Sequence, residues 1–197
     1  MNKGQLTKER IIKKAAELFN SRGYNGSSMT ELMKITGLKK GGIYNHFQNK
    51  EEIAVEAFKY SMKLLTNKLH DFMKNENTPG GQLNAILDFY QTYPLKPLVT
   101  GGCPILNTSV DADNTNILLL QKVQKALTNV LNNLAGIIDR GKELGEFNES
   151  VDSHDAAVVI TTALQGGIMA TRTYHDDKYM KIVLKQLKDF VDTKIMK

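Results

Sequence analysis

The sequence predicts an all-α protein. Apolar residues recur at three-to-four spacing along most of its 197 residues. Strict alternation is rare, and no Asn-Gly turn separates two β-branched runs, so the signals for strands are weak. Two short helices joined by a glycine-containing turn near the N-terminus are typical of a helix-turn-helix. We therefore expect a three-helix head followed by a longer helical body, with about nine helices in all.

The first helix is expected at about residues 8–21, with Thr7 as its N-cap. The triplet Arg22-Gly23-Tyr24 should end it. Its apolar positions lie on one face, which should pack against the helix-turn-helix: Ile11, Ile12, Ala15, Ala16 and Phe19.

The second helix has clear signals at both ends. Ser28 is placed as its N-cap, and Glu31, three residues later, can complete a reciprocal capping box. Gly37 suits the left-handed position that ends a helix. A turn over residues 37–40 then leads into the recognition helix, which we expect to end near Phe47.

A further capping box, Asn49 with Glu52, predicts a helix over residues 49–75. The sequence Thr78-Pro79-Gly80-Gly81 is a break, after which a helix near 82–93 is expected.

The rest of the chain also shows helical periodicity. Residues 94–104 hold three of the four prolines and should form a connection, with a short helix running on through Leu106 and Asn107. Gly145-Glu146-Phe147 should lie in a loop. Long helices are expected over residues 115–142, 152–173 and 177–195.

Positive charge is concentrated at the N-terminal end of the chain. The net charge is +5, and residues 1–60 contain 11 lysines and arginines against six acidic residues. Residues 61–197 contain 15 of each sign. All of the excess therefore lies in the segment with the helix-turn-helix, which indicates a polyanion such as double-stranded DNA as the partner.

Other classes of function have little support. The single cysteine, Cys103, excludes an intrachain disulfide and suits a reducing cytoplasm. No apolar run is long enough to span a membrane, and the N-terminus lacks the apolar core of a signal peptide. His70, His154 and His175 have no Cys or His partner at metal-ligand spacing. Phosphate-loop, nucleophile-elbow and HExxH motifs are absent, so we expect no enzyme, no metal and no cofactor.

One stretch of the chain combines several short motifs in a fixed order. Residues 7–60 contain Arg22-Gly23-Tyr24, the capped second helix, Gly37-Leu38, Gly41, Ile43-Tyr44-x-x-Phe47 and Asn49-Lys50-Glu51. With these segments, residues 7–60 resemble the tetracycline-repressor (TetR) family of bacterial transcription regulators. After residue 60 the resemblance is one of architecture. It implies a DNA-binding head at residues 1–50 and a body at 51–197 that dimerises and binds an inducer.

The chain departs from the family pattern at four positions. Met33 and Thr36 stand where alanines are usual, and Lys39 stands where serine is common. Gly42 replaces a threonine or serine whose hydroxyl could contact DNA. With Gly41 it places two glycines in the recognition helix, each costing roughly 1 kcal/mol relative to alanine.

The resemblance assigns a role to each residue of the head. The start of the second helix should face a phosphate, and the first residues of the recognition helix should reach the groove. Tyr44 and Lys50 should hold the DNA backbone, and Asn45 and His46 should contact base edges or phosphate. The expected DNA-binding residues are Ser28, Met29, Lys39, Lys40, Gly41, Gly42, Tyr44, Asn45, His46 and Lys50.

For the body, the resemblance implies a four-helix bundle made with a second subunit, and an inducer pocket. The expected dimer contacts, for some of which burial within one subunit is the alternative, are Val158, Val159, Thr162, Ile168, Met169, Ile182, Val183, Leu187, Phe190 and Val191. The expected pocket residues are Phe58, Met62, Phe89, Tyr93, Cys103, Asn107 and Met169. Cys103 lies between glycines and a proline at a helix start, a setting that can activate a thiol, although a small buried residue is the simpler interpretation.

Three functions are compatible with these patterns. The favoured one is a homodimeric repressor that binds a palindromic operator and is released by a small-molecule inducer. The second is a TetR-like DNA-binding protein without such an inducer, controlled by a partner protein or by oxidation of Cys103. The third is a helical interaction domain whose basic head binds another acidic partner.

Overall fold

The computed structural model describes residues 2–197, which form nine α-helices, a π-helical turn and no β-strand. The predicted all-α fold is confirmed. An isolated bridge between Phe147 and Met196 is the β-type pairing found in this range. None of the helices in these residues is long and apolar enough to cross a membrane. The helices are α1 Lys3–Arg22, α2 Met29–Thr36, α3 Lys40–Tyr44, α4 Lys50–Met73, α5 Pro79–Thr92, α6 Pro104–Ala112, α7 Ile117–Glu143, α8 Ser153–Tyr174 and α9 Lys178–Phe190, followed by the π-helical turn Val191–Ile195.

The chain packs into two compact units. The first comprises the residues up to Leu65 together with Leu98–Lys125, and the second comprises Thr66–Pro97 and Ala126–Lys197. The first unit thus contains α1–α3, most of α4, α6 and the start of α7. The expected domains were divided at residue 50, whereas packing groups α6 with the helix-turn-helix.

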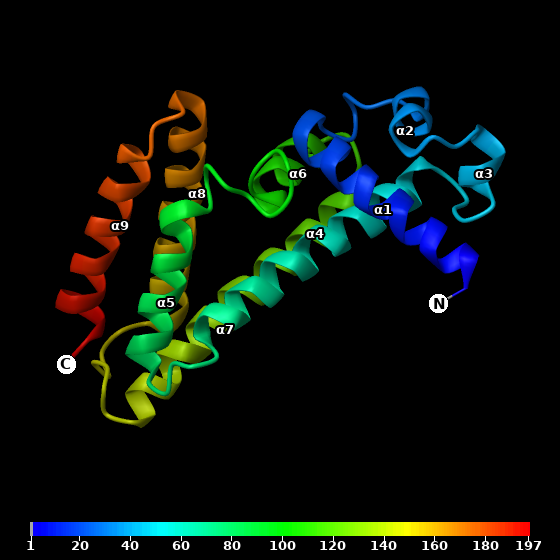
Figure 1. Ribbon diagram of the computed structural model, residues 1–197. Coiled ribbons are helices and arrows are strands. Elements are labelled where there is room, and N and C mark those ends of the chain that lie inside the picture. Colours follow the sequence, from blue (N-terminus) through cyan, green and yellow to red (C-terminus); the bar gives the residue numbers. More distant parts are fainter. Residues whose placement is uncertain (1) are drawn as a thin grey trace. The chain divides into compact units, whose positions relative to one another are not determined.

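The first unit is built around the apolar face of α1. Ile11 and Ala15 of α1 are fully buried, as are Leu32 of α2, Ile43 of α3 and Ile53 of α4. Burying each of the larger side chains contributes about 1.5–3 kcal/mol, so this cluster holds the two short helices α2 and α3 against the longer helices α1 and α4. α6 packs against the C-terminal end of α1 in the same unit (Figure 1).

The first helix starts earlier than predicted. Asn2 is its N-cap, and its side-chain oxygen accepts a hydrogen bond from the Gln5 amide at 2.9 Å. Thr7, which we expected to cap the helix, instead donates from its hydroxyl to the Lys3 carbonyl at 3.0 Å. A threonine inside a helix can bond to the carbonyl four residues earlier, so its presence does not mark a helix start.

Local signals around the second helix are confirmed. Ser28 and Glu31 form the reciprocal capping box, and Gly37 ends α2 in the left-handed conformation with φ +69°. The recognition helix α3 ends at Tyr44, three residues before the expected end, because the chain turns at Asn45–His46. The buried Phe47 therefore follows the helix.

Two later helix starts also differ from expectation. The Asn49 side chain accepts from the Glu52 amide at 2.8 Å, but the Glu52 carboxylate accepts from the Gln48 amide, so the predicted second capping box is not reciprocal. The segment expected as a break forms the first turn of α5, with Thr78 as its N-cap and Pro79 as its first residue. Proline suits that position because the first amides of a helix have no intrahelical acceptor.

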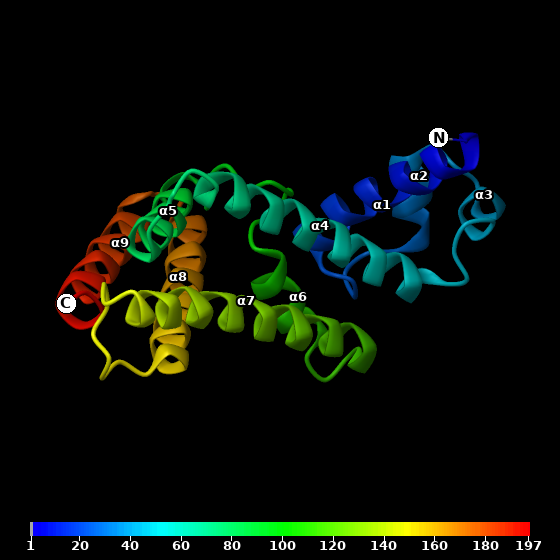
Figure 2. The same ribbon diagram turned by 90° about the horizontal axis from the view of Figure 1, so that it is seen from below.

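In the second unit, α9 packs against both α8 and α5 (Figures 1 and 2). Gly167 allows the close approach of α8 and α9, because a Cβ there would lie 2.9 Å from the Met180 methyl group. Gly145 has φ +73° in the loop predicted after α7, and Phe147 in that loop is fully buried.

Candidate nucleic-acid interface

The N-terminus of α2 is fixed by polar contacts among its own residues. The Ser28 hydroxyl oxygen accepts from the Glu31 amide at 3.1 Å, and the Glu31 carboxylate accepts from the Ser28 amide at 2.8 Å. Arg22 forms an ion pair of 2.6 Å with the other oxygen of Glu31. The hydrogen bond from the Ser28 amide, followed by that from its hydroxyl, lowers the pKa of Glu31. Arg22 therefore offsets an acidic group at the place where a DNA phosphate is expected.

The start of α3 presents positive charge and bare backbone to solvent. Lys39, Lys40 and Gly41 are exposed, and Gly42 is half-buried. The Lys40 ammonium lies 5.7 Å from the centre of the Tyr44 ring. A Cβ at Gly41 would meet nothing within 4 Å, and one at Gly42 would make only ordinary contacts with Leu38. Packing within the protein therefore does not require a glycine at either position.

The remaining head residues divide into exposed and buried ones. Asn45 is exposed, while Met29, Tyr44 and His46 are half-buried. Ile43 is fully buried in the core of the first unit.

Lys50 has a different environment from the other lysines of the head. Its ammonium donates to the Tyr24 carbonyl at 2.5 Å and lies 4.0 Å from the centre of the Tyr24 ring. The centre of the Phe19 ring is 5.9 Å away. Burial lowers the pKa of Lys50, with Asp111 and Glu31 acting in the opposite direction. Lys50 thus joins the start of α4 to the turn after α1, which is a contact the sequence did not indicate.

Asp111 of α6 is the main residue that the sequence analysis missed. Its carboxylate accepts a hydrogen bond from the Tyr24 amide at 2.6 Å, 87 residues away in the chain. Asn107, expected in a ligand pocket, donates its side-chain amide to the carbonyls of Asn20 and Gly101, each at 2.9 Å. No local pattern links residues so far apart, so no sequence signal was available.

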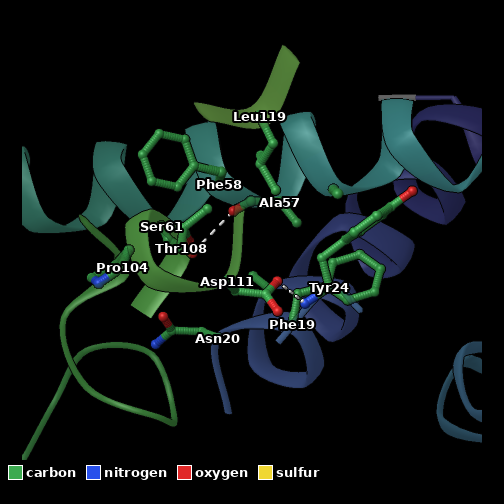
Figure 3. Close-up of a pocket in the computed structure, with 12 residues that line it drawn as sticks. Phe19, Asn20, Tyr24, Ala57, Phe58, Ser61, Pro104, Thr108, Asp111 and Leu119 are labelled. Carbon is green, nitrogen blue, oxygen red and sulfur yellow. Dashed lines mark hydrogen bonds between the residues drawn. The ribbon is translucent and has the colours of Figure 1, made fainter. Parts of the chain in front are cut away.

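A cavity of about 350 Å³, counting the open space at its mouth, lies within the first unit. Figure 3 shows aromatic and polar side chains from α1, α4 and α6 around it. Its enclosed part has room for little more than one water molecule. The residues around it are Ala16, Phe19, Asn20, Tyr24, Ala54, Ala57, Phe58, Ser61, Pro104, Thr108, Asp111 and Leu119.

The expected pocket residues lie in several environments. In the first unit, Phe58 lines the cavity, Met62 is half-buried on α4 and Cys103 is buried at the start of α6. In the second unit, the Phe89 and Tyr93 rings lie 5.0 Å apart between their centres and are tilted by 35°. Met169 of α8 is 58% exposed, so its side chain is at the surface of the protomer and not in a cavity. Among residues 2–197, no group of three or more His, Cys, Asp or Glu side chains is placed to hold a metal ion.

Comparisons with known proteins agree for both parts of the chain. Residues 11–57 match the family described as bacterial regulatory proteins, tetR family, and residues 79–187 match the tetracyclin repressor-like C-terminal domain. The crystal structure of a TetR transcriptional regulator from Chloroflexus aurantiacus J-10-FL superposes with a TM-score of 0.96 at 31% identity, covering 100% of this chain and 99% of that one.

Two relatives of this chain are named regulators. The fatty acid metabolism regulator protein of Bacillus subtilis (strain 168) is 27% identical over 175 residues, covering 88% of this chain and 87% of the relative. The negative transcriptional regulator IcaR of the Staphylococcus aureus (strain Newman) biofilm operon icaADBC is 30% identical over 82 residues, which is 42% of each chain.

Proposed function

Because the chain belongs to the TetR family of bacterial regulatory proteins, we propose that it is a homodimeric repressor, released from its operator by a small-molecule inducer. It is a transcriptional regulator with a DNA-binding helix-turn-helix, and not an enzyme. The observation that carries the proposal is the exposed, basic start of α3, held on a rigid apolar core by Ile43. Such a regulator acts in the cytoplasm, where the bacterial chromosome lies.

The repressor role is supported by the resemblance to a negative regulator over the N-terminal part of the chain. A repressor needs only to occupy its operator, so the DNA-binding head is the part that determines where it acts. We assign the operator contacts to the ten head residues named above, with Lys39 and Lys40 at the groove.

The dimer is supported by an exposed stripe on α8. Successive exposed positions recur at three and four residues along one face of the helix: Val159, Thr162, Gly166, Met169 and Thr173. Three expected contacts, Ile168, Leu187 and Val191, are buried within the protomer and therefore contribute to its own core. A two-fold dimer presents two recognition helices to half-sites about 34–36 Å apart, which requires a palindromic operator.

An inducer acts by binding one conformation of the protein more tightly than another. The name of the Bacillus subtilis relative makes fatty acids the first class of compound to test. We propose an inducer because regulators of this family are typically controlled by small molecules. The small cavity of the first unit is not the basis for this part of the proposal.

Selection of binding sequences from random DNA duplexes tests the proposed operator directly. We expect enrichment of a palindrome with half-sites one helical turn apart. Enrichment of no sequence, or of an asymmetric one, would contradict the proposal.

The selected duplex then allows a test of the recognition helix. Lys40→Ala should weaken binding measured by fluorescence anisotropy and reduce the slope of log affinity against log salt by about 0.9, which is the loss of one phosphate contact. Lys125→Ala removes an exposed lysine from α7 and serves as the matched control, with no change in slope. An unchanged affinity in Lys40→Ala would exclude Lys40 from the interface.

A further inference from the structure

The turn between α1 and α2 is held by a residue from α6. The Asp111 carboxylate accepts from the Tyr24 amide at 2.6 Å and from the Asn25 amide at 3.4 Å, as Figure 3 shows for Tyr24. The Asn25 side chain donates in return to the Asp111 carbonyl and to the Thr115 hydroxyl, each at 2.9 Å. Hydrogen bonds to a carboxylate are about twice as strong as those between neutral groups, so this contact fixes the turn firmly.

The backbone of the turn is shaped for this approach. Gly23 has φ +77°, and a Cβ on it would lie 2.7 Å from an Asp111 carboxylate oxygen. Any side chain at Gly23 would therefore displace Asp111. The glycine identified in the sequence as the end of the first helix also makes room for the α6 carboxylate.

A second set of contacts ties the same end of α1 to the segment before α6. The buried Asn20 side chain donates to the carbonyls of Thr100 and Gly102, each at 3.0 Å. Asn107 donates back to the Asn20 carbonyl. The last turn of α1 is thus attached both to the segment before α6 and to α6 itself.

Tyr24 links these contacts to the DNA-binding elements. Its amide is bound by Asp111, and its carbonyl accepts from Lys50 at the start of α4. Four residues later, Ser28 caps α2, whose N-terminus is expected to face a phosphate. The position of Tyr24 therefore sets the position of α2 relative to α4.

We propose that Asp111 is a positioning residue for DNA binding, which acts by holding the Tyr24–Asn25 turn and hence the N-terminus of α2. The proposal rests on the DNA-binding part of the proposed function. Positioning and charge predict opposite effects of Asp111 substitution on the strength of DNA binding. Removing a negative charge from a protein that binds a polyanion should strengthen binding if charge alone matters. Removing a positioning carboxylate should weaken it.

The test compares Asp111→Ala with Asp113→Ala. Asp113 is exposed at the end of α6, so its substitution makes the same change in net charge two residues away. We expect Asp111→Ala to weaken specific operator binding about tenfold, equivalent to about 1.4 kcal/mol, with an unchanged salt slope. Asp113→Ala should bind the operator as the wild type does, or slightly more tightly.

Three further variants test whether Asp111 acts through the Tyr24–Asn25 turn. Asn25→Ala removes the reciprocal donor, and the double variant Asn25→Ala/Asp111→Ala should lose less affinity than the product of the two single losses, because both act through one contact. Asp111→Asn keeps one acceptor and should lose only about twofold to fourfold. If Asp111→Ala does not fold, Asn25→Ala and Asp111→Asn carry the test.

A titration at DNA concentrations far above Kd counts the binding-competent molecules. A positioning role leaves this count at the wild-type value and raises Kd, whereas a purely structural role lowers the count. Wild-type or tighter operator binding by Asp111→Ala, or a reduced count with unchanged Kd, would overturn the proposal. Failure of the wild-type protein to select any operator would refute the proposed function instead.

Discussion

The Lys50 ammonium lies where three elements of the head meet. It donates to the Tyr24 carbonyl, and the Tyr24 ring lies 4.0 Å away. A cation over an aromatic face contributes about 0.5–1 kcal/mol, or more when water is excluded. One of the three ammonium donors is thus committed within the protein. A DNA phosphate would have to bind one of the other two, so Lys50 serves the structure of the head in either case.

The distance between partners in the sequence explains which residue contacts could be predicted. Ser28 and Glu31 are three residues apart, so their capping box follows from spacing alone and is confirmed. Tyr24 and Asp111 are 87 residues apart, and an aspartate in a helix carries no sign of its acceptor role. Asn107 was expected to line an inducer pocket, and its role as a donor to the Asn20 carbonyl of α1 could not be predicted from the sequence.

Cys103 offers a direct test of the thiol-sensor alternative. Its side chain is 1% exposed at the N-cap of α6, and reactive cysteines are partly exposed. We expect the native protein to react with a thiol-specific reagent at a rate far below that of the unfolded chain. Cys103→Ser should leave any oxidant-induced release of DNA unchanged. Rapid stoichiometric labelling of the native protein, with release abolished in Cys103→Ser, would establish the sensor instead.

At the scale of elements, the sequence predicted the long helices well, because each has many apolar positions at helical spacing. It predicted the ends of the shorter helices less well. The long helices α7, α8 and α4 lie close to their expected ranges because many apolar positions define each one. The start of α5 was placed too late because proline and glycine were interpreted as a break, although proline is favoured in the first turn. The early end of α3 at Tyr44 arises because the chain turns to bury Phe47.

The exposed faces of α8 and α9 predict where a dimer can be disrupted. Ile182 on α9 is 60% exposed in the protomer, and α9 packs against α8, which carries the exposed stripe proposed for the dimer. The wild-type protein should have twice the 22.0 kDa mass of one chain by light scattering. Ile182→Glu should shift it to the single-chain mass, because pairing would bury an unpartnered charge.

Val110→Glu is the control for this change. Val110 is 74% exposed on α6, so the substitution introduces the same charge at another exposed apolar site. It should leave the dimer intact. Dissociation by Val110→Glu with no effect of Ile182→Glu would move the interface from α9 to α6.

At the scale of the molecule, the positively charged segment and the first compact unit cover different residues. Excess positive charge is confined to residues 1–60, while the first compact unit also includes Leu98–Lys125. The excess positive charge could be located from the sequence because it belongs to one continuous segment, residues 1–60. It could not predict that α6 joins the head, since Asn20, Asn107 and Asp111 meet only after the chain has folded.

Control of the whole molecule by an inducer predicts a linked pair of measurements. A ligand present at 100 times its Kd stabilises the native state by about 2.7 kcal/mol. For a chain of this length, the resulting rise in Tm is about 5–10 °C, which a screen of fatty acids by thermal unfolding would detect.

Reciprocity then separates an inducer from an incidental ligand. If the compound weakens operator binding by some factor, the operator must weaken binding of the compound by the same factor. We expect equal factors when the compound is titrated with and without the selected duplex. A compound that raises Tm but leaves both affinities unchanged binds without controlling the protein. Absence of any stabilising compound from a broad apolar screen would favour control by a partner protein, because a ligand that binds only the native state must raise its stability.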